Sequence, residues 1–203
     1  MIKLITRGDD SGSAQSANKA ILDAYVHGNL KSTSIMVPTP HYAEAVSLFK
    51  DHSEFEIGLH ATITDEWDAP RWGPVLPAAD VSSLVYDDAT FFTDCVQLWE
   101  RYGGDEQDQR PSNDEIMNEI SAQLDTVRQD GLHIAYLDTH MGFDWFHGLS
   151  ERLQEFCKAE GIIYGNAMDQ ISPIPQVEGE FDTPVDQLID RLAYQIHPRL
   201  VES

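Results

Sequence analysis

With 203 residues and a hydrophobic share of 41%, the chain is long enough to bury the core of one domain, and this composition excludes a disordered chain. Its 35 acidic residues outnumber 13 basic ones, giving a formal net charge of -22, so we expect no nucleic-acid partner, because the protein would repel a polyanion. No stretch approaches the roughly 18 apolar residues that span a bilayer, so we expect no membrane partner either.

The cysteines and the N-terminus favour a cytoplasmic protein. Cys95 and Cys157 match no metal or redox spacing, and Cys157 lies on the apolar face of a predicted helix, where we expect a buried free thiol. The apolar stretch at the start is interrupted by Lys3 and ended by charged residues, unlike a secretory signal. For the assembly we expect a homodimer, since dimers are the commonest soluble oligomers.

Strands and helices are predicted to alternate in the first part of the chain. Short apolar runs that end at polar or proline residues indicate buried strands, and apolar positions at helical spacing indicate helices between them. We expect strands at 2–6, 32–37 and 55–59, a helix that begins at an N-cap Ser16 and ends at Gly28, and a helix from Tyr42 to Lys50.

The stretch from Asp65 to Pro111 has no sustained period and is rich in proline and aromatic residues. Connections of this length without clear elements are usually functional loops or lids. We therefore predict an irregular excursion near 65–111 that covers the substrate, with one short helix from about Phe92 to Arg101.

Regular alternation returns after the excursion. Ser112 and Glu115 fit a capping box at the start of a helix that runs to Gly131. We then expect a strand at 133–137, a helix at 148–160 stopped by Gly161, a strand at 162–164 and a last helix opened by Thr183-Pro184. Strands that alternate with helices imply a parallel sheet or barrel, and no internal boundary divides the chain into two domains.

Four residues stand just past predicted strands: Asp9 and Asp10 after the first, His60 after the third, and His140 after the strand at 133–137. Strand carboxyl ends gather on one face of parallel α/β folds, so we expect these residues to converge. One carboxylate and two imidazoles can hold a metal while leaving positions for water and substrate. Taken singly, each residue is also explained as a helix cap, a turn or a hydrogen-bonded structural histidine.

Several motifs occur in the order found in the YdjC family, the ChbG/HpnK-like carbohydrate deacetylases, and the chain resembles that family over most of residues 2–164. The motifs are Ile5-Thr6-Arg7-Gly8-Asp9-Asp10-Ser11-Gly12, Asn18-Lys19-Ala20-Ile21, His27-Gly28, Ser32-Thr33-Ser34-Ile35-Met36-Val37, Ile57-Gly58-Leu59-His60-Ala61-Thr62-Ile63-Thr64 and Tyr136-Leu137-Asp138-Thr139-His140.

This resemblance implies one YdjC-like deacetylase domain over 1–203, folded as a deformed (β/α) barrel of about seven parallel strands, similar to a TIM barrel. It implies one divalent ion, Mg or Zn, held by Asp10, His60 and His140, with Asp9 as the general base. It also implies removal of acetyl groups from a small N-acetylated sugar, of N-acetylglucosamine or chitooligosaccharide type.

The residues expected to protonate the leaving amine match the family's motifs less well. His197-Pro198-Arg199 is the candidate for the family's His-Pro-Gly motif, which makes His197 the candidate general acid, although a surface histidine is an equal alternative. Met141 and Gly142 follow His140 where most relatives carry further histidines, and His147 is a candidate replacement or an ordinary helix-start residue.

Further residues are candidates for binding the sugar or for pairing with the aspartates. Arg71 and Trp72, in Arg71-Trp72-Gly73-Pro74, resemble a motif in one branch of the family and are candidate sugar-binding residues, as are Trp67 and Trp145; loop anchoring explains each equally well. Arg7 is expected to pair with Asp9 or Asp138.

Two other functions remain open. The protein is alternatively a metal-containing sugar-binding protein without turnover, or a hydrolase of another class, such as a phosphoesterase, on the same scaffold. The strong negative charge disfavours a phosphorylated substrate, and the retention of Asp9 favours an enzyme over a binding protein.

Overall fold

The structure is a computed structural model that describes residues 5–101, 111–146 and 148–165. Contacts group Ile5–Ala167 into one compact unit, and every described residue belongs to it. The prediction of a single domain over 1–203 is not tested by these residues, and the predicted helix at Thr183 lies outside them.

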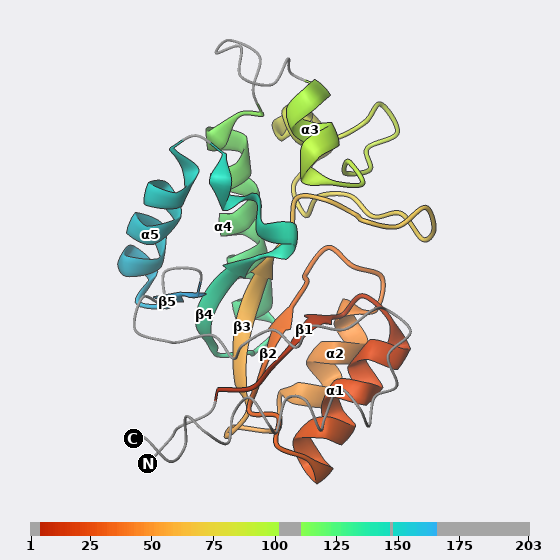
Figure 1. Ribbon diagram of the computed structural model, residues 1–203, viewed down its shortest axis with the longest axis vertical. Helices are drawn as coiled ribbons and strands as arrows, with labels where there is room; N and C mark the ends of the chain where they lie inside the picture. The colour runs from red at the N-terminus through yellow and green to blue at the C-terminus, as the bar shows by residue number, and fades with distance from the viewer. Residues whose placement is uncertain (1–4, 102–110, 147, 166–203) are drawn as a thin grey trace, which may run out of the picture. The chain divides into compact units, whose positions relative to one another are not determined.

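Five parallel strands form one sheet in the order β1-β2-β3-β4-β5 (Figure 1). Because each strand follows its sequence neighbour in the same direction, the predicted α/β fold with a parallel sheet is confirmed. The described residues do not test the closure of a barrel. The strands are β1 (Arg7–Ser11), β2 (Ser32–Ile35), β3 (Glu56–Ala61), β4 (Ile134–Thr139) and β5 (Ile163–Tyr164).

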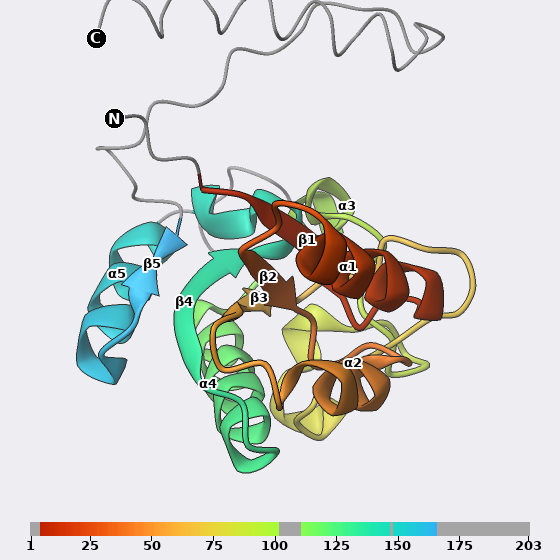
Figure 2. The ribbon, with the colours of Figure 1, turned by 90° about the horizontal axis from the view of Figure 1, so that it is seen from below.

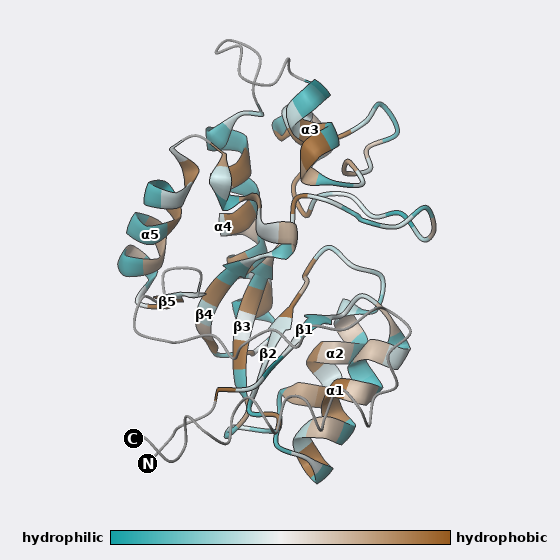
Figure 3. Cartoon of the chain, viewed as in Figure 1, coloured by the Kyte–Doolittle hydropathy of each residue, from teal (hydrophilic) through white to brown (hydrophobic). Residues whose placement is uncertain are grey.

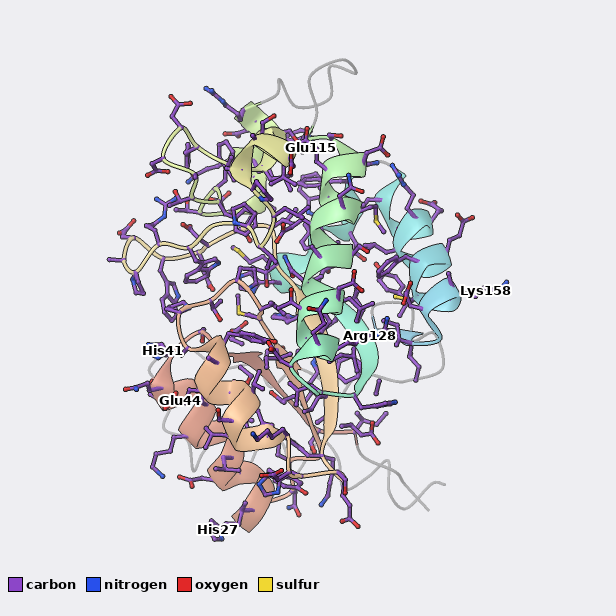
Figure 4. All side chains as sticks on the ribbon, turned by 180° about the vertical axis from the view of Figure 1, so that it is seen from behind. His27, His41, Glu44, Glu115, Arg128 and Lys158 are labelled. Carbon is purple, nitrogen blue, oxygen red and sulfur yellow. The ribbon has the colours of Figure 1, made fainter. Side chains whose placement is uncertain are left out.

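Four helices form an arc along one side of the curved sheet (Figure 2). They are α1 (Gln15–His27), α2 (Tyr42–Phe49), α4 (Asn113–Gln129) and α5 (Leu149–Glu160). Glu115 and Arg128 mark the two ends of α4 in Figure 4. The expected signals hold at two ends, since the Ser112 hydroxyl accepts a hydrogen bond from Glu115 N, and Gly161 closes α5 in a left-handed conformation.

Apolar and polar side chains alternate along the central strands of the sheet. Ile35, Leu59 and Leu137 are neighbours in adjacent strands, and all three are fully buried in the hydrophobic core that includes residues of α2 and α4. Figure 3 shows these apolar stretches on β3 and β4, with polar residues on the outer sides of α4 and α5. The positions between them carry polar groups, including Ser34, His60 and Asp138, so this second set supplies the site.

The predicted strand boundaries were wrong where the site begins. The first described strand is Arg7–Ser11 rather than 2–6, so Asp9 and Asp10 lie inside it; His60 lies inside β3, and β4 runs on to Thr139. The strands continue through polar residues, because the backbone hydrogen bonds between strands do not depend on the polarity of the side chain. In the sequence, however, a strand is recognised by its apolar run, and that run stops at the first polar residue. The first helix begins at Gln15, without the predicted Ser16 cap.

The excursion is irregular, as predicted, through residues 65–101. It contains two single-turn helices, η1 (Ala78–Asp80) and η2 (Ser82–Leu84), and the short helix α3 (Cys95–Arg101), which lies beyond the end of β3 in Figure 1. Glu119 of α4 fastens it by accepting hydrogen bonds from the backbone N–H groups of Val75 and Leu76. Among the described residues, no helix combines the length and apolar character needed to cross a bilayer.

Candidate metal centre

Asp10 enters the site through an irregularity in β1. Its backbone φ is 62°, in the left-handed region, and the register between β1 and β2 shifts between Gly8 and Ser11. Asp tolerates this conformation better than most residues, and a local bulge changes the direction in which a side chain points. The Asp10 carboxylate thereby lies close to histidines from the neighbouring strands.

Asp10, His60 and His140 form a cluster whose candidate ligand atoms all lie within 4.8 Å of one another. Oδ1 of Asp10 is 3.2 Å from Nε2 of His60 and 3.4 Å from Nδ1 of His140. Both histidines are buried, whereas the Asp10 side chain is 45% exposed. Three strand ends therefore supply one cluster that is open to solvent on one side.

The electrostatics favour an ionised Asp10. Hydrogen bonds with His140 and His60 hold the pKa of the Asp10 carboxyl well below its usual range. Burial acts to lower the pKa of His60, but hydrogen bonds with the Asp10 and Asp138 carboxylates outweigh it and raise the pKa to about 9. The carboxylates of Asp10 and Asp138 thus favour positive charge at this position, and in the metal-free protein the His60 ring carries it.

A divalent ion fits this donor set. Atoms that bind one ion at about 2.0–2.2 Å lie roughly 3–3.5 Å from each other, the range of the two distances from Asp10 Oδ1. Three protein ligands leave coordination positions for water and substrate, as in catalytic rather than structural sites. The donor set that the sequence predicted is therefore brought together in three dimensions.

Asp138 orients His60 from behind. The two residues are partners in the register of β3 and β4, and Nδ1 of His60 lies 2.8 Å from Oδ1 of Asp138. Asp138 is 2% exposed; its second oxygen accepts a hydrogen bond from Ser34 Oγ at 2.9 Å and forms an ion pair with Arg7 Nη1 at 2.5 Å. A carboxylate in this position fixes the ring of a metal-binding histidine and keeps its other nitrogen free to bind.

Gly58 makes room for the rest of this network. A Cβ at Gly58 would lie 2.1 Å from the ring of Tyr136, its partner across the strands. The Tyr136 hydroxyl lies 3.0 Å from Ser34 Oγ, the hydroxyl that also bonds Asp138. The glycine of the Gly58-Leu59-His60 motif is thus explained by a ring that packs across it.

Arg7 connects Asp9 to the same network. Its Nε and Nη2 donate to the two carboxylate oxygens of Asp9, at 2.6 and 3.3 Å, while Nη1 bonds Asp138. Burial acts against the charge, but the carboxylates of Asp138 and Asp9 raise the pKa of Arg7. The expected pairing is confirmed with both partners; the role of Asp9 as general base stays a prediction.

The predicted sugar-binding residues Arg71 and Trp72 make contacts within the excursion. Arg71 bonds the Asp65 carboxylate, Thr90 Oγ1 and the Phe91 carbonyl. Trp72 is 5% exposed, and its indole N–H donates to the Thr64 carbonyl at 3.1 Å. These are the contacts of loop anchors, and substrate binding by either residue stays a prediction.

Trp145 is an exposed aromatic side chain in the turn that follows β4. It ends η3 (His140–Trp145), the turn that starts at His140, and it is 51% exposed. Its ring meets Trp99 and Phe146 edge-on, with centroids 5.8 and 4.6 Å apart. His197, the predicted general acid, and His147 lie outside the described residues.

Sequence reasoning underrated Asp138 and missed Glu66. Asp138 appeared only as part of a motif and as a partner of Arg7, although it lies opposite His60 in the register of β3 and β4. Glu66, whose carboxylate lies 3.7 Å from Nε2 of His140, follows no recognisable pattern in the excursion.

Comparisons with known proteins agree with the motifs. The family described as YdjC-like protein matches residues 3–196. A carbohydrate deacetylase of Vibrio cholerae serotype O1 is 33% identical over 139 residues, 68% of this chain and 48% of the relative. One from Listeria monocytogenes serotype 4b is 30% identical over 139 residues, 68% of this chain and 51% of the relative. The chain thus spans about half the length of the curated relatives it matches.

A crystal structure supports the fold. It is that of a protein from Enterococcus faecalis, assigned provisionally as a cellobiose-phosphate cleavage protein, and it is 19% identical to this chain with a TM-score of 0.63. The match covers 95% of this chain and 64% of the other. At this identity, the similarity concerns the fold alone.

Proposed function

This chain belongs to the YdjC-like protein family, and from that membership and the geometry of its site we propose that it is a metal-dependent carbohydrate deacetylase. The observation that supports this most directly is the cluster of Asp10, His60 and His140, with ligand atoms all within 4.8 Å of one another. The names of the relatives from Vibrio and Listeria supply the reaction class.

A divalent ion bound there would polarise an amide carbonyl and lower the pKa of a water molecule. Asp10, His60 and His140 would hold the ion, and Asp9 would accept the proton of the water whose oxygen adds to the acetyl carbonyl carbon. The C–N bond then breaks, the nitrogen takes up a proton, and acetate and a free amine leave. His197 remains the candidate donor of that proton.

The charge distribution favours a neutral N-acetylated sugar of N-acetylglucosamine or chitooligosaccharide type. The formal net charge is -22, and the arginines Arg7 and Arg71 are both engaged by carboxylates. Neither arginine is therefore free to bind the phosphate group of a phosphorylated substrate. Trp145, as an exposed aromatic surface beside His140, is suited to pack against a sugar ring.

Two imidazoles and a single carboxylate favour zinc, or a similar transition metal, over magnesium, which prefers oxygen ligands. We expect tight binding of one zinc ion per chain, and much weaker binding by Asp10→Asn.

The decisive experiment measures acetate released from N-acetylated chitooligosaccharides by protein loaded with zinc or magnesium. Wild type should release acetate, Asp10→Asn should lose both metal and activity, and Asp9→Asn should keep the metal while losing activity. No acetate from wild type with metal bound contradicts the proposal. Sugar binding without acetate release would instead identify a binding protein.

A further inference from the structure

The two histidines of the metal centre differ in what their second ring nitrogen meets. Nδ1 of His60 has Asp138 at 2.8 Å. Nε2 of His140 is buried and has no hydrogen-bond partner among the described residues. Histidines that bind metals almost always donate their other N–H to a carboxylate, a carbonyl or water. The second nitrogen of His140 therefore lacks an acceptor that its chemistry requires.

Glu66 lies next to this nitrogen. Its Oε2 is 3.7 Å from His140 Nε2, slightly beyond a hydrogen bond, and its side chain is 45% exposed, so it has room to move. Its carboxylate does not belong to the cluster of candidate ligand atoms. Glu66 thus lies beside the ring nitrogen of His140 that faces away from the cluster, as Asp138 lies beside the corresponding nitrogen of His60.

The backbone at Glu66 supports a functional placement. Four non-glycine residues of the described chain have left-handed backbones: Asp10, Glu66, Ala89 and Met141. Asp10 is a ligand, and Met141 directly follows the ligand His140. Residues held in such conformations cluster at functional sites, where the surrounding structure enforces them. Glu66, with φ of 56°, belongs to this group.

The residues before Glu66 are firmly held. The Asp65 backbone N–H donates to the Phe92 carbonyl at 2.9 Å, and the Asp65 carboxylate is bonded by Arg71. The Thr64 carbonyl accepts from the Trp72 indole. The anchors Arg71 and Trp72 thereby hold the chain in the turn that presents Glu66 to His140.

We propose that Glu66 is a positioning residue of the metal centre, which accepts a hydrogen bond from Nε2–H of His140 while Nδ1 of that ring binds the metal. This inference rests on the metal site of the proposed function, but not on its substrate or its reaction. Glu66 fixes the tautomer and the orientation of His140, as Asp138 does for His60.

The test measures zinc affinity without substrate, by competition with a chromogenic chelator. Loss of a carboxylate behind a metal-binding histidine typically weakens metal binding about 10–100-fold. We expect Glu66→Ala to show that loss, and Glu66→Gln, whose amide oxygen can still accept, to restore most of the affinity. Asp68→Asn removes one exposed acidic group from the same segment and is the matched control, with unchanged affinity.

Nuclear magnetic resonance of the histidine nitrogens provides a second readout. In the zinc-bound wild type we expect the His140 proton on Nε2, and in Glu66→Ala an increased exchange of that proton with solvent. Wild-type affinity in Glu66→Ala, or an equal loss in Glu66→Gln and Glu66→Ala, would overturn the positioning role. Absence of zinc binding by wild type would overturn the metal centre as well, so the two failures are distinguishable.

Discussion

Nδ1 of His60 lies 2.8 Å from Oδ1 of Asp138, and the two residues are partners in the register of adjacent parallel strands. The bond turns Nε2 of His60 toward Asp10, 3.2 Å away. Because backbone pairing places the two side chains beside each other, the sheet itself orients this ligand. The candidate metal centre is thus built on paired strands rather than on loops.

Replacing Asp138 should weaken metal binding more than it weakens the fold. Asp138→Asn keeps an acceptor for His60 but loses the charge that pairs with Arg7, and we expect zinc affinity to fall about 10-fold or more. Zinc titration of each variant checks this, with Glu56→Gln, an exposed acidic position at the start of the neighbouring strand β3, as control. Equal affinities in the two variants would show that Asp138 does not support the site.

The sequence predicted the three residues that cluster, and it placed His140 correctly after β4 but Asp10 and His60 wrongly relative to their strands. His60 and Asp10 were expected after strand ends and lie within β3 and β1. The apolar run that marks a strand stops at a polar residue, although backbone pairing continues through side chains that face the inside of the sheet. Motif order identified Asp10, whereas the bulge that directs it toward His60 depends on pairing with β2.

Other parts of the site had no sequence signal. Glu66 reaches His140 because its neighbours are anchored by residues up to 27 positions away, as in the bond from Asp65 to Phe92. Trp72 was a candidate for sugar binding, and its contacts are those of a residue that anchors a loop. The sequence alone does not distinguish these two roles for a tryptophan in the excursion. Such outcomes depend on packing that no local pattern encodes.

Glu119 should be important for stability rather than for chemistry. It is fully buried on α4, and it accepts hydrogen bonds from the backbone of Val75 and Leu76 and from the Gln123 amide. Glu119→Gln turns one acceptor into a donor that faces another donor, which costs about 1–3 kcal/mol of unfolding free energy.

Urea unfolding of the metal-free protein measures this loss. Asp125→Asn removes the same charge from an exposed position of α4 and should leave the midpoint unchanged. An unchanged midpoint in Glu119→Gln would mean that the excursion is not fastened through this carboxylate.

Neither cysteine should react with a thiol reagent while the protein is folded. Burial raises the pKa of Cys95 to about 12 and that of Cys157 to about 11, so both remain protonated at pH 8, and only the thiolate reacts. Both side chains are almost fully buried, and neither is in a disulfide. Absorbance of Ellman's reagent should therefore show slow labelling of native protein and two thiols after unfolding in guanidinium. Rapid native labelling would contradict the buried positions.

Arg7 should affect catalysis through the two carboxylates that it joins. Its guanidinium donates two hydrogen bonds to Asp9 and forms an ion pair with the buried Asp138. A lysine keeps the charge but cannot form this planar arrangement, so Arg7→Lys should lower kcat for acetate release while leaving zinc affinity near the wild-type value. Arg7→Ala should lower both, because the buried Asp138 carboxylate then loses the cation beside its second oxygen. Acetate release against pH and zinc titration separate these effects. Wild-type kcat and pH profile in Arg7→Ala would show that Asp9 does not depend on Arg7 for its position.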